Sequence, residues 1–190
     1  MRAAIVVAGG AARRLGGVDK ALVEIGGTTM LDRVLAAAAP NVDELVVVGP
    51  KRATNLPRVR FTLEDRPGGG PVPAVAAGLG VVREAYLVVV LAVDLPLLET
   101  EHIATLVAGL ANTGADAVAA ADHRGQPNPL LAAYRGDRLR AAASRLGADT
   151  PAAGLLPAAT VVVDLGEAGT LNVNQPEELE RARRRLRLGP

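Results

Sequence analysis

The sequence predicts a three-layer α/β/α sandwich built on a mostly parallel β-sheet. Short apolar runs rich in valine recur along the chain, and such runs are typical of strands buried on both faces. Longer helical patterns separate these runs, and this alternation is typical of a parallel sheet covered by helices. The chain has 190 residues, 49% of them hydrophobic, with no internal repeat and no long linker. We therefore expect a single domain over residues 1–190.

The predicted elements follow one another in a regular order. The strands are expected at residues 3–8, 44–48, 59–63, 86–93, 117–121, 129–134 and 161–164. The helices are expected at residues 30–39, 72–83, 100–110, 137–146 and 176–187. Pro73 and Pro176 suit the first turn of a helix, and Thr100 is expected to be an N-cap. Ligands of such sheets bind beyond the carboxyl ends of the strands, so function is expected in the loops that follow them.

The composition excludes several classes of function. The chain has no Cys, two His and one serine, Ser144, which lies in a helical pattern. Thiolate, serine-nucleophile and zinc chemistry are therefore poorly supported. The formal charge of +1 argues against a nucleic-acid coat or a membrane-surface protein. Because no apolar run approaches the roughly 20 residues of a membrane span and no signal peptide is evident, we expect a cytoplasmic protein.

The loop after the first strand, VAGGAARRLGGVDK at residues 7–20, is rich in glycine and in basic residues. Glycines expose backbone N–H groups, while Arg14 and Lys20 add positive charge, and this combination suits a polyphosphate. It is neither a Walker loop nor a dinucleotide fingerprint, because both the residues around Lys20 and the glycine spacing differ. Glycine pairs also form ordinary turns, but a lysine is rare in this chain, which has only Lys20 and Lys51.

Three further loops carry polar residues. Asp65 precedes three glycines at residues 68–70 and could accept hydrogen bonds from a base or a ribose. Asp94 directly follows the most apolar strand, where a carboxylate can hold magnesium together with substrate phosphates. Asn172 and Asn174 could face one side of an extended segment and bind a substrate phosphate or order the metal site. The simpler alternatives are a flexible surface loop at residues 68–70, a turn or helix cap for Asp94, and a helix cap for Asn174.

Together these segments resemble the molybdenum cofactor guanylyltransferases, which attach GMP to molybdopterin. The most specific part is AGGAARRLGGVDK at residues 8–20, because related cytidylyl enzymes usually have proline where this chain has Asp19. Further matches lie at residues 64–65, 70–71, 93–96, 126–130 and 172–179. The resemblance covers nearly the whole chain and implies a Rossmann-like fold of the nucleotide-diphospho-sugar transferase type.

The resemblance also implies roles for individual residues. It implies that GTP is bound by Val7, Ala8, Gly9 and Lys20. Asp65 would contact the nucleotide, and Asp94 would bind both nucleotide and Mg²⁺, the one expected cofactor. The chain departs from the family where Gly49 replaces a frequent asparagine, where residues 70–75 read GPVPAV, and where Asn128 replaces a frequent histidine.

The reaction that the resemblance implies is attack by the terminal phosphate of molybdenum-molybdopterin on the α-phosphorus of GTP, with release of pyrophosphate. Lys20 and Arg14 would surround the phosphates, Asp94 would hold magnesium, and the backbone from Ala8 to Gly10 would approach the nucleotide. The chain's only aromatic residues are one Phe and two Tyr, so we expect backbone groups and aliphatic walls to hold the guanine.

Other functions remain open at this point. One is transfer of CMP to molybdopterin, or of a nucleotide to another small phosphate; another is a catalytically inactive GTP-binding accessory protein. Molybdenum-insertion proteins or molybdoenzyme chaperones are the expected protein partners, with neither nucleic acid nor membrane among the partners. The basic run at residues 181–187 is expected to be a solvated helix face rather than a nucleic-acid site.

Overall fold

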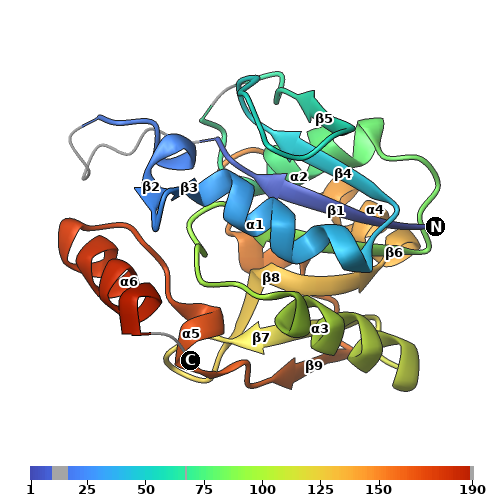
Figure 1. Ribbon diagram of the computed structural model, residues 1–190. Coiled ribbons are helices and arrows are strands. Elements are labelled where there is room, and N and C mark those ends of the chain that lie inside the picture. Colours follow the sequence, from blue (N-terminus) through green and yellow to red (C-terminus); the bar gives the residue numbers. More distant parts are fainter. Residues whose placement is uncertain (10–16, 67, 189–190) are drawn as a thin grey trace.

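The structure is a computed structural model that describes residues 1–9, 17–66 and 68–188 (Figure 1). Its main sheet has the strand order β5-β4-β1-β6-β8-β7-β9. In chain order these strands are β1 (Arg2–Val7), β4 (Glu44–Val48), β5 (Val59–Thr62), β6 (Leu87–Ala92), β7 (Ala117–Ala121), β8 (Pro127–Arg135) and β9 (Thr160–Val163). Within this sheet β8 runs antiparallel to both of its neighbours, and the other pairings are parallel. The predicted mostly parallel sheet is confirmed.

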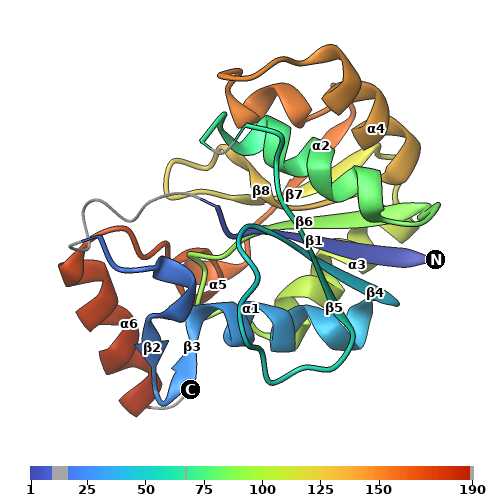
Figure 2. The ribbon, with the colours of Figure 1, turned by 90° about the horizontal axis from the view of Figure 1, so that it is seen from above.

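Helices cover both faces of the sheet. They are α1 (Met30–Ala38), α2 (Pro71–Val81), α3 (Thr100–Asn112), α4 (Gly136–Arg145), α5 (Gly166–Thr170) and α6 (Pro176–Leu188). Figure 2 shows α1 and α3 on one face and α2 and α4 on the other. The buried side chains of β1 alternate accordingly, with Ala4 and Val6 toward α1 and α3 and Ala3 and Ile5 toward α2 and α4. The three-layer sandwich is therefore confirmed.

The order of the strands creates a crevice at the carboxyl-terminal end of the central strands. From β1 the chain passes through α1 to β4 and β5 on one side, and it then returns through α2 to β6 on the other side of β1. The carboxyl ends of β1 and β6 therefore lie where the strand order reverses, which is the usual ligand site of such sheets. Gly78 lets α2 pack closely on β1, because a Cβ there would lie 2.6 Å from Cγ2 of Ile5.

A small hairpin and the C-terminal helix pack together outside the main sheet. The hairpin of β2 (Glu24–Ile25) and β3 (Thr28–Thr29) packs against α6, and a separate apolar cluster includes Ile25, Val173 and Ala182. The sequence predicted neither this hairpin nor α5, because elements of two to five residues are too short to show a periodic pattern. The prediction of Thr100 as an N-cap is wrong, since Glu99 is the N-cap of α3.

The basic run of α6 is partly paired within the chain. Arg181 and Arg185 form ion pairs with Glu167 of α5, and Arg183 forms one with Glu180. These contacts favour a surface helix face over a nucleic-acid site. Of the helices in the described part of the chain, none combines the length and apolar character needed to cross a bilayer.

Candidate active site

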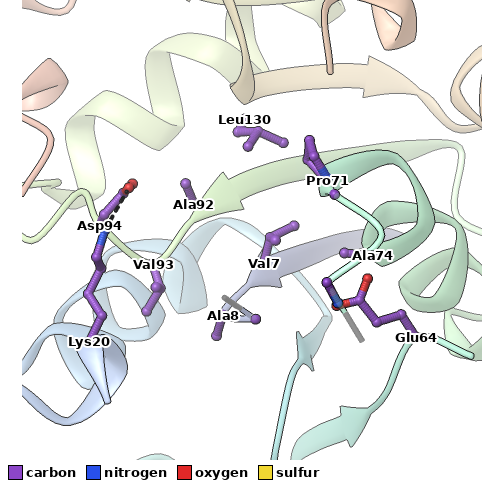
Figure 3. Close-up of a pocket in the computed structure, with 13 residues that line it drawn as sticks. Val7, Ala8, Lys20, Glu64, Pro71, Ala74, Ala92, Val93, Asp94 and Leu130 are labelled. Atoms are coloured by element: carbon purple, nitrogen blue, oxygen red, sulfur yellow. Dashed lines mark hydrogen bonds and ion pairs between the residues drawn. The ribbon is translucent and has the colours of Figure 1, made fainter. Parts of the chain in front are cut away.

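A cavity of about 340 Å³ lies at the carboxyl ends of β1 and β6 (Figure 3). Val7 and Ala92 are paired in the parallel register, so the segments that follow both strands begin side by side. The Val93 N–H donates to the Val7 carbonyl at 3.0 Å, and the Ala8 N–H donates to the Val48 carbonyl at 2.9 Å. The cavity is lined by residues from these strand ends, the segment after β5, the start of α2, and β8, together with Lys20: Val7, Ala8, Gly9, Lys20, Glu64, Gly68, Gly70, Pro71, Ala74, Ala92, Val93, Asp94 and Leu130.

Three predicted residues meet at one end of the cavity. The Lys20 ammonium donates to Oδ1 of Asn174 at 2.7 Å and lies 3.5 Å from Oδ2 of Asp94. The Val173 N–H donates to the Asp94 carbonyl at 2.8 Å and so holds the segment of Asn174 against the loop after β6. Burial raises the pKa of Asp94, while the positive charge of Lys20 opposes the rise. Because burial disfavours the charged form of Asp94, a further cation or hydrogen-bond donor beside it would stabilise the carboxylate.

An ion pair between Asp19 and Arg52 positions the segment that carries Lys20. Asp19 is the N-cap of a short 3-10 helix, Lys20–Leu22, and accepts from the Ala21 N–H at 3.1 Å. The Arg52 guanidinium donates to both carboxylate oxygens of Asp19, at 2.7 and 3.0 Å, and its Nη2 also donates to the Ala8 carbonyl at 3.3 Å. Arg52 thus joins the two segments that carry Ala8 and Lys20, and we call Arg52 and Asp19 the loop clasp.

Gly49 makes room for the loop clasp. Its φ is +150°, and a Cβ at this position would lie 3.0 Å from the Ala8 carbonyl oxygen and 3.1 Å from Nη1 of Arg52. The glycine that replaces the frequent asparagine of similar enzymes therefore lies against an arginine that reaches the same strand end. The sequence indicated a lost side-chain contact here but gave no reason to expect Arg52 in its place.

The two neighbouring acids after β5 lie in different places. Glu64 lines the cavity described above, whereas Asp65 is exposed and lines a second cavity of about 640 Å³ with residues of α2 such as Pro73 and Ala77. The structure thus brings Glu64, and not the predicted Asp65, beside Ala8 and Gly9. The adjacent acidic residues were the signal, but their side chains line different cavities in the turn that follows β5.

The remaining predicted site residues fall into three groups. Val7, Ala8 and Gly9 line the cavity as expected. Asn172 is exposed, while Asn174 turns its amide to Lys20. Arg14 and Gly10 lie outside the described residues. Asn128, which replaces a frequent histidine, accepts a hydrogen bond from the N–H of Leu130, a residue that lines the cavity.

The oxygen atoms near Lys20 suit a hard cation only when the phosphates of a substrate supply further ligands. Over residues 1–9, 17–66 and 68–188 no three His, Asp or Glu side chains form a metal cluster. Asp94 and Asn174 nevertheless both place an oxygen atom within hydrogen-bonding distance of the Lys20 ammonium group. Mg²⁺ is commonly held by one or two carboxylates plus substrate phosphates, so the residues present fit such an ion when a triphosphate is bound.

Comparison with known proteins identifies related nucleotidyltransferases. A family model described as the MobA-like NTP transferase domain matches residues 4–161. A curated relative from Natronomonas pharaonis, named a probable molybdenum cofactor guanylyltransferase, is 31% identical over 97% of this chain and 98% of its own length. The molybdenum cofactor guanylyltransferase of Shewanella sp. strain MR-4 is 36% identical over 67% of this chain, and this chain spans 66% of that relative's length.

A solved structure shows the same fold over almost the full length. The molybdopterin-guanine dinucleotide biosynthesis protein A of Archaeoglobus fulgidus superposes with a TM-score of 0.74 at 24% identity, covering 97% of both chains. The predicted fold of the nucleotide-diphospho-sugar transferase type is thereby confirmed. The extent of the family match and the full-length relative place this chain in the MobA-like NTP transferase family.

Proposed function

We propose that this protein transfers GMP from GTP to the terminal phosphate of molybdenum-molybdopterin, forming molybdopterin guanine dinucleotide and pyrophosphate. The observation that carries the proposal is the meeting of Lys20, Asp94 and Asn174 at the carboxyl ends of β1 and β6, at one end of a cavity that the exposed backbone of Gly9 also lines. The names of the full-length relative and of the Shewanella relative support the choice of guanylyl transfer and of the acceptor.

The transfer needs positioning and charge neutralisation more than acid–base chemistry. An oxygen of the acceptor phosphate, already anionic near neutral pH, forms a bond to the α-phosphorus of GTP. The bond from the α-phosphorus to the bridging oxygen breaks, and its electron pair leaves with pyrophosphate. Lys20 donates to the phosphate oxygens on which negative charge accumulates, and Asn174 holds the ammonium group in place. Arg14, which lies outside the described residues, is proposed to add positive charge for binding the phosphates.

Asp94 is the proposed ligand of Mg²⁺. The ion would neutralise the triphosphate and supply Lewis-acid polarisation of its oxygens. Lys20 lies 3.5 Å from this carboxylate, so the lysine lessens the cost of burying its charge.

The test is a panel of nucleotides and acceptors. Pyrophosphate release is measured with GTP, CTP or ATP and with molybdopterin or other small phosphates, at several Mg²⁺ concentrations. We expect release with GTP and molybdopterin that depends on both the acceptor and the metal. Faster release with CTP, or with a different acceptor, would replace the proposed substrates. Binding of GTP without release under any of these conditions would indicate an inactive accessory protein.

The expected product suggests where the protein acts and what receives its product. Molybdenum-insertion proteins or molybdoenzyme chaperones in the cytoplasm are the proposed recipients, because a bound cofactor dinucleotide must pass to the enzymes that use it. Co-purification of such proteins with the product-loaded enzyme would support this, and absence of any association under transfer conditions would argue against direct delivery.

A further inference from the structure

One oxygen of the Glu64 carboxylate, which lines the cavity, has no hydrogen-bonding partner among the described residues. Oε2 of Glu64 is buried and accepts no hydrogen bond from any residue that the structure describes. From the part of the chain that the structure describes, its other oxygen, Oε1, accepts a single long bond, of 3.4 Å, from the Gly68 N–H. Burial of an unpaired carboxylate oxygen costs free energy, so such atoms are usually satisfied by a partner. Glu64 therefore has the capacity to accept hydrogen bonds from a bound molecule.

The position of Glu64 indicates which part of the nucleotide it meets. Figure 3 shows Glu64 and the Lys20–Asp94 pair at opposite ends of the group of lining residues, with Val7 and Ala8 between them. If the phosphates lie at Lys20 and Asp94, the base extends toward Glu64. The backbone of Gly9 lies against the carboxylate, because a Cβ on Gly9 would be 3.2 Å from Oε1.

The walls at this end contain aliphatic side chains and bare backbone. Pro71, Ala74 and Leu130 line the cavity with Gly68 and Gly70, and no aromatic residue is among the 13 that line it. The expectation that aliphatic walls and backbone hold the base agrees with this lining. These groups give little discrimination between bases, however, so the carboxylate of Glu64 is the strongest hydrogen-bonding group at this end.

The hydrogen-bonding pattern of guanine matches a carboxylate. An ionised carboxylate only accepts hydrogen bonds, and its two oxygens can accept from two neighbouring donors. Guanine presents such a pair, N1–H and the 2-amino group, on its Watson–Crick edge. Adenine and cytosine present one amino group next to an acceptor nitrogen, which would face the carboxylate unfavourably. We infer that Glu64 is the specificity-determining residue that reads the Watson–Crick edge of guanine, an inference that rests on the proposed use of GTP.

Equilibrium binding of base-modified nucleotides tests this assignment without an acceptor. Dissociation constants are measured for GTP, inosine triphosphate and xanthosine triphosphate with the wild-type protein, Glu64→Gln and Asp65→Asn. The wild-type protein should bind inosine triphosphate roughly 10-fold more weakly than GTP, because the 2-amino donor is missing. Xanthosine triphosphate should bind more weakly still, since a carbonyl oxygen replaces that donor.

Glu64→Gln should reverse the preference. The amide keeps one acceptor for N1–H and offers one donor to the 2-carbonyl of xanthine, so we expect roughly 10- to 100-fold weaker GTP binding and a gain for xanthosine triphosphate. Melting temperatures of the nucleotide-free proteins show whether each variant folds. Asp137→Asn, an exposed change on α4, is the matched control and should bind like the wild-type protein.

The binding ratios and the transfer assay test the role of Glu64 and the proposed reaction separately. An unchanged ratio of GTP to xanthosine triphosphate in a folded Glu64→Gln protein overturns the inference, and so does a reversal produced by Asp65→Asn in its place. If the ratio reverses but no acceptor yields pyrophosphate, Glu64 reads guanine and the proposed transfer reaction fails. If transfer proceeds with an unchanged ratio, the reaction stands and the assignment of Glu64 fails.

Discussion

Arg52 donates two hydrogen bonds to the carboxylate of Asp19, from Nε at 2.7 Å and from Nη2 at 3.0 Å. The side chain of Arg52 is only 7% exposed, while that of Asp19 is 39% exposed. This two-bond geometry fixes the segment immediately before Lys20 relative to the loop after β4. The residue that distinguishes this loop from those of related cytidylyl enzymes, Asp19, thus acts by holding the site together and not by lining the cavity.

Arg52→Ala should weaken both the fold and the site. Loss of Arg52 removes the ion-pair partner of Asp19 and a hydrogen bond to the Ala8 carbonyl, so we expect a loss of about 1–3 kcal/mol in the free energy of unfolding and a higher KM for GTP. Arg52→Lys should recover little, because an ammonium cannot make the two parallel bonds. Urea unfolding and initial rates measure both effects.

A surface arginine provides the control for this experiment. Arg138 pairs with Asp116 at 3.2 Å and is 57% exposed, so Arg138→Ala should change stability by less than about 1 kcal/mol and leave KM unaltered. Wild-type stability and KM in Arg52→Ala would show that the loop clasp has no effect on the site.

Gly49→Asn should destabilise the protein, although it introduces the residue that is frequent in similar enzymes. Its side chain would begin 3.0 Å from the Ala8 carbonyl oxygen, in a backbone conformation that side chains rarely adopt. We expect a cost of about 1–3 kcal/mol, measured by urea unfolding. Gly147→Asn, at a glycine whose Cβ position is open, is the matched control. Equal stability of the two variants would contradict the close approach at Gly49.

Lys20 and Asn174 should act as one unit. Lys20→Ala is expected to lower kcat/KM roughly 10- to 100-fold, because a charge-assisted contact to phosphate is lost. Asn174→Ala should lower it less, by roughly 2- to 10-fold, since the amide acts through the position of the ammonium group. The double variant should be no worse than Lys20→Ala alone. Additive losses in the double-mutant cycle would mean that Asn174 contacts substrate independently.

Asp122 should contribute stability that depends on pH. Its Oδ1 accepts from the N–H groups of Gln126 and Arg124, both at 2.8 Å, and these bonds lower the pKa of the carboxyl group. A lowered pKa in the folded protein stabilises it above the unfolded value of 3.8, and the contribution disappears as the pH falls through the folded value. The melting temperature of Asp122→Ala at pH 7 should therefore be lower than that of the wild-type protein.

The difference between Asp122→Ala and the wild-type protein is followed by thermal unfolding from pH 7 to pH 3. We expect it to shrink as the pH falls below about 4. A difference that stays constant or grows in acid would show that the turn is not held by an ionised carboxylate.

The fold and the position of Asp94 at the end of β6 were predictable because both follow from local pattern. The valine-rich runs at β4 and β6 could only be buried strands, and Asp94 directly follows one of them. The contact between Lys20 and Asn174 joins residues 154 positions apart, so no local pattern could predict it. The choice between Glu64 and Asp65 likewise depends on the path of the backbone after β5, which the sequence of that loop does not determine.

Transfer of label from the α-phosphate of GTP tests the central proposal most directly. GTP labelled at that phosphate is incubated with molybdopterin, Mg²⁺ and either the wild-type protein or Asp94→Asn, and labelled dinucleotide and pyrophosphate are measured together. We expect equal amounts of both products from the wild-type protein and at least about 100-fold slower transfer by a folded Asp94→Asn protein. Label that stays in GTP with the wild-type protein, or transfer at the wild-type rate by Asp94→Asn, would contradict the proposed reaction at this site.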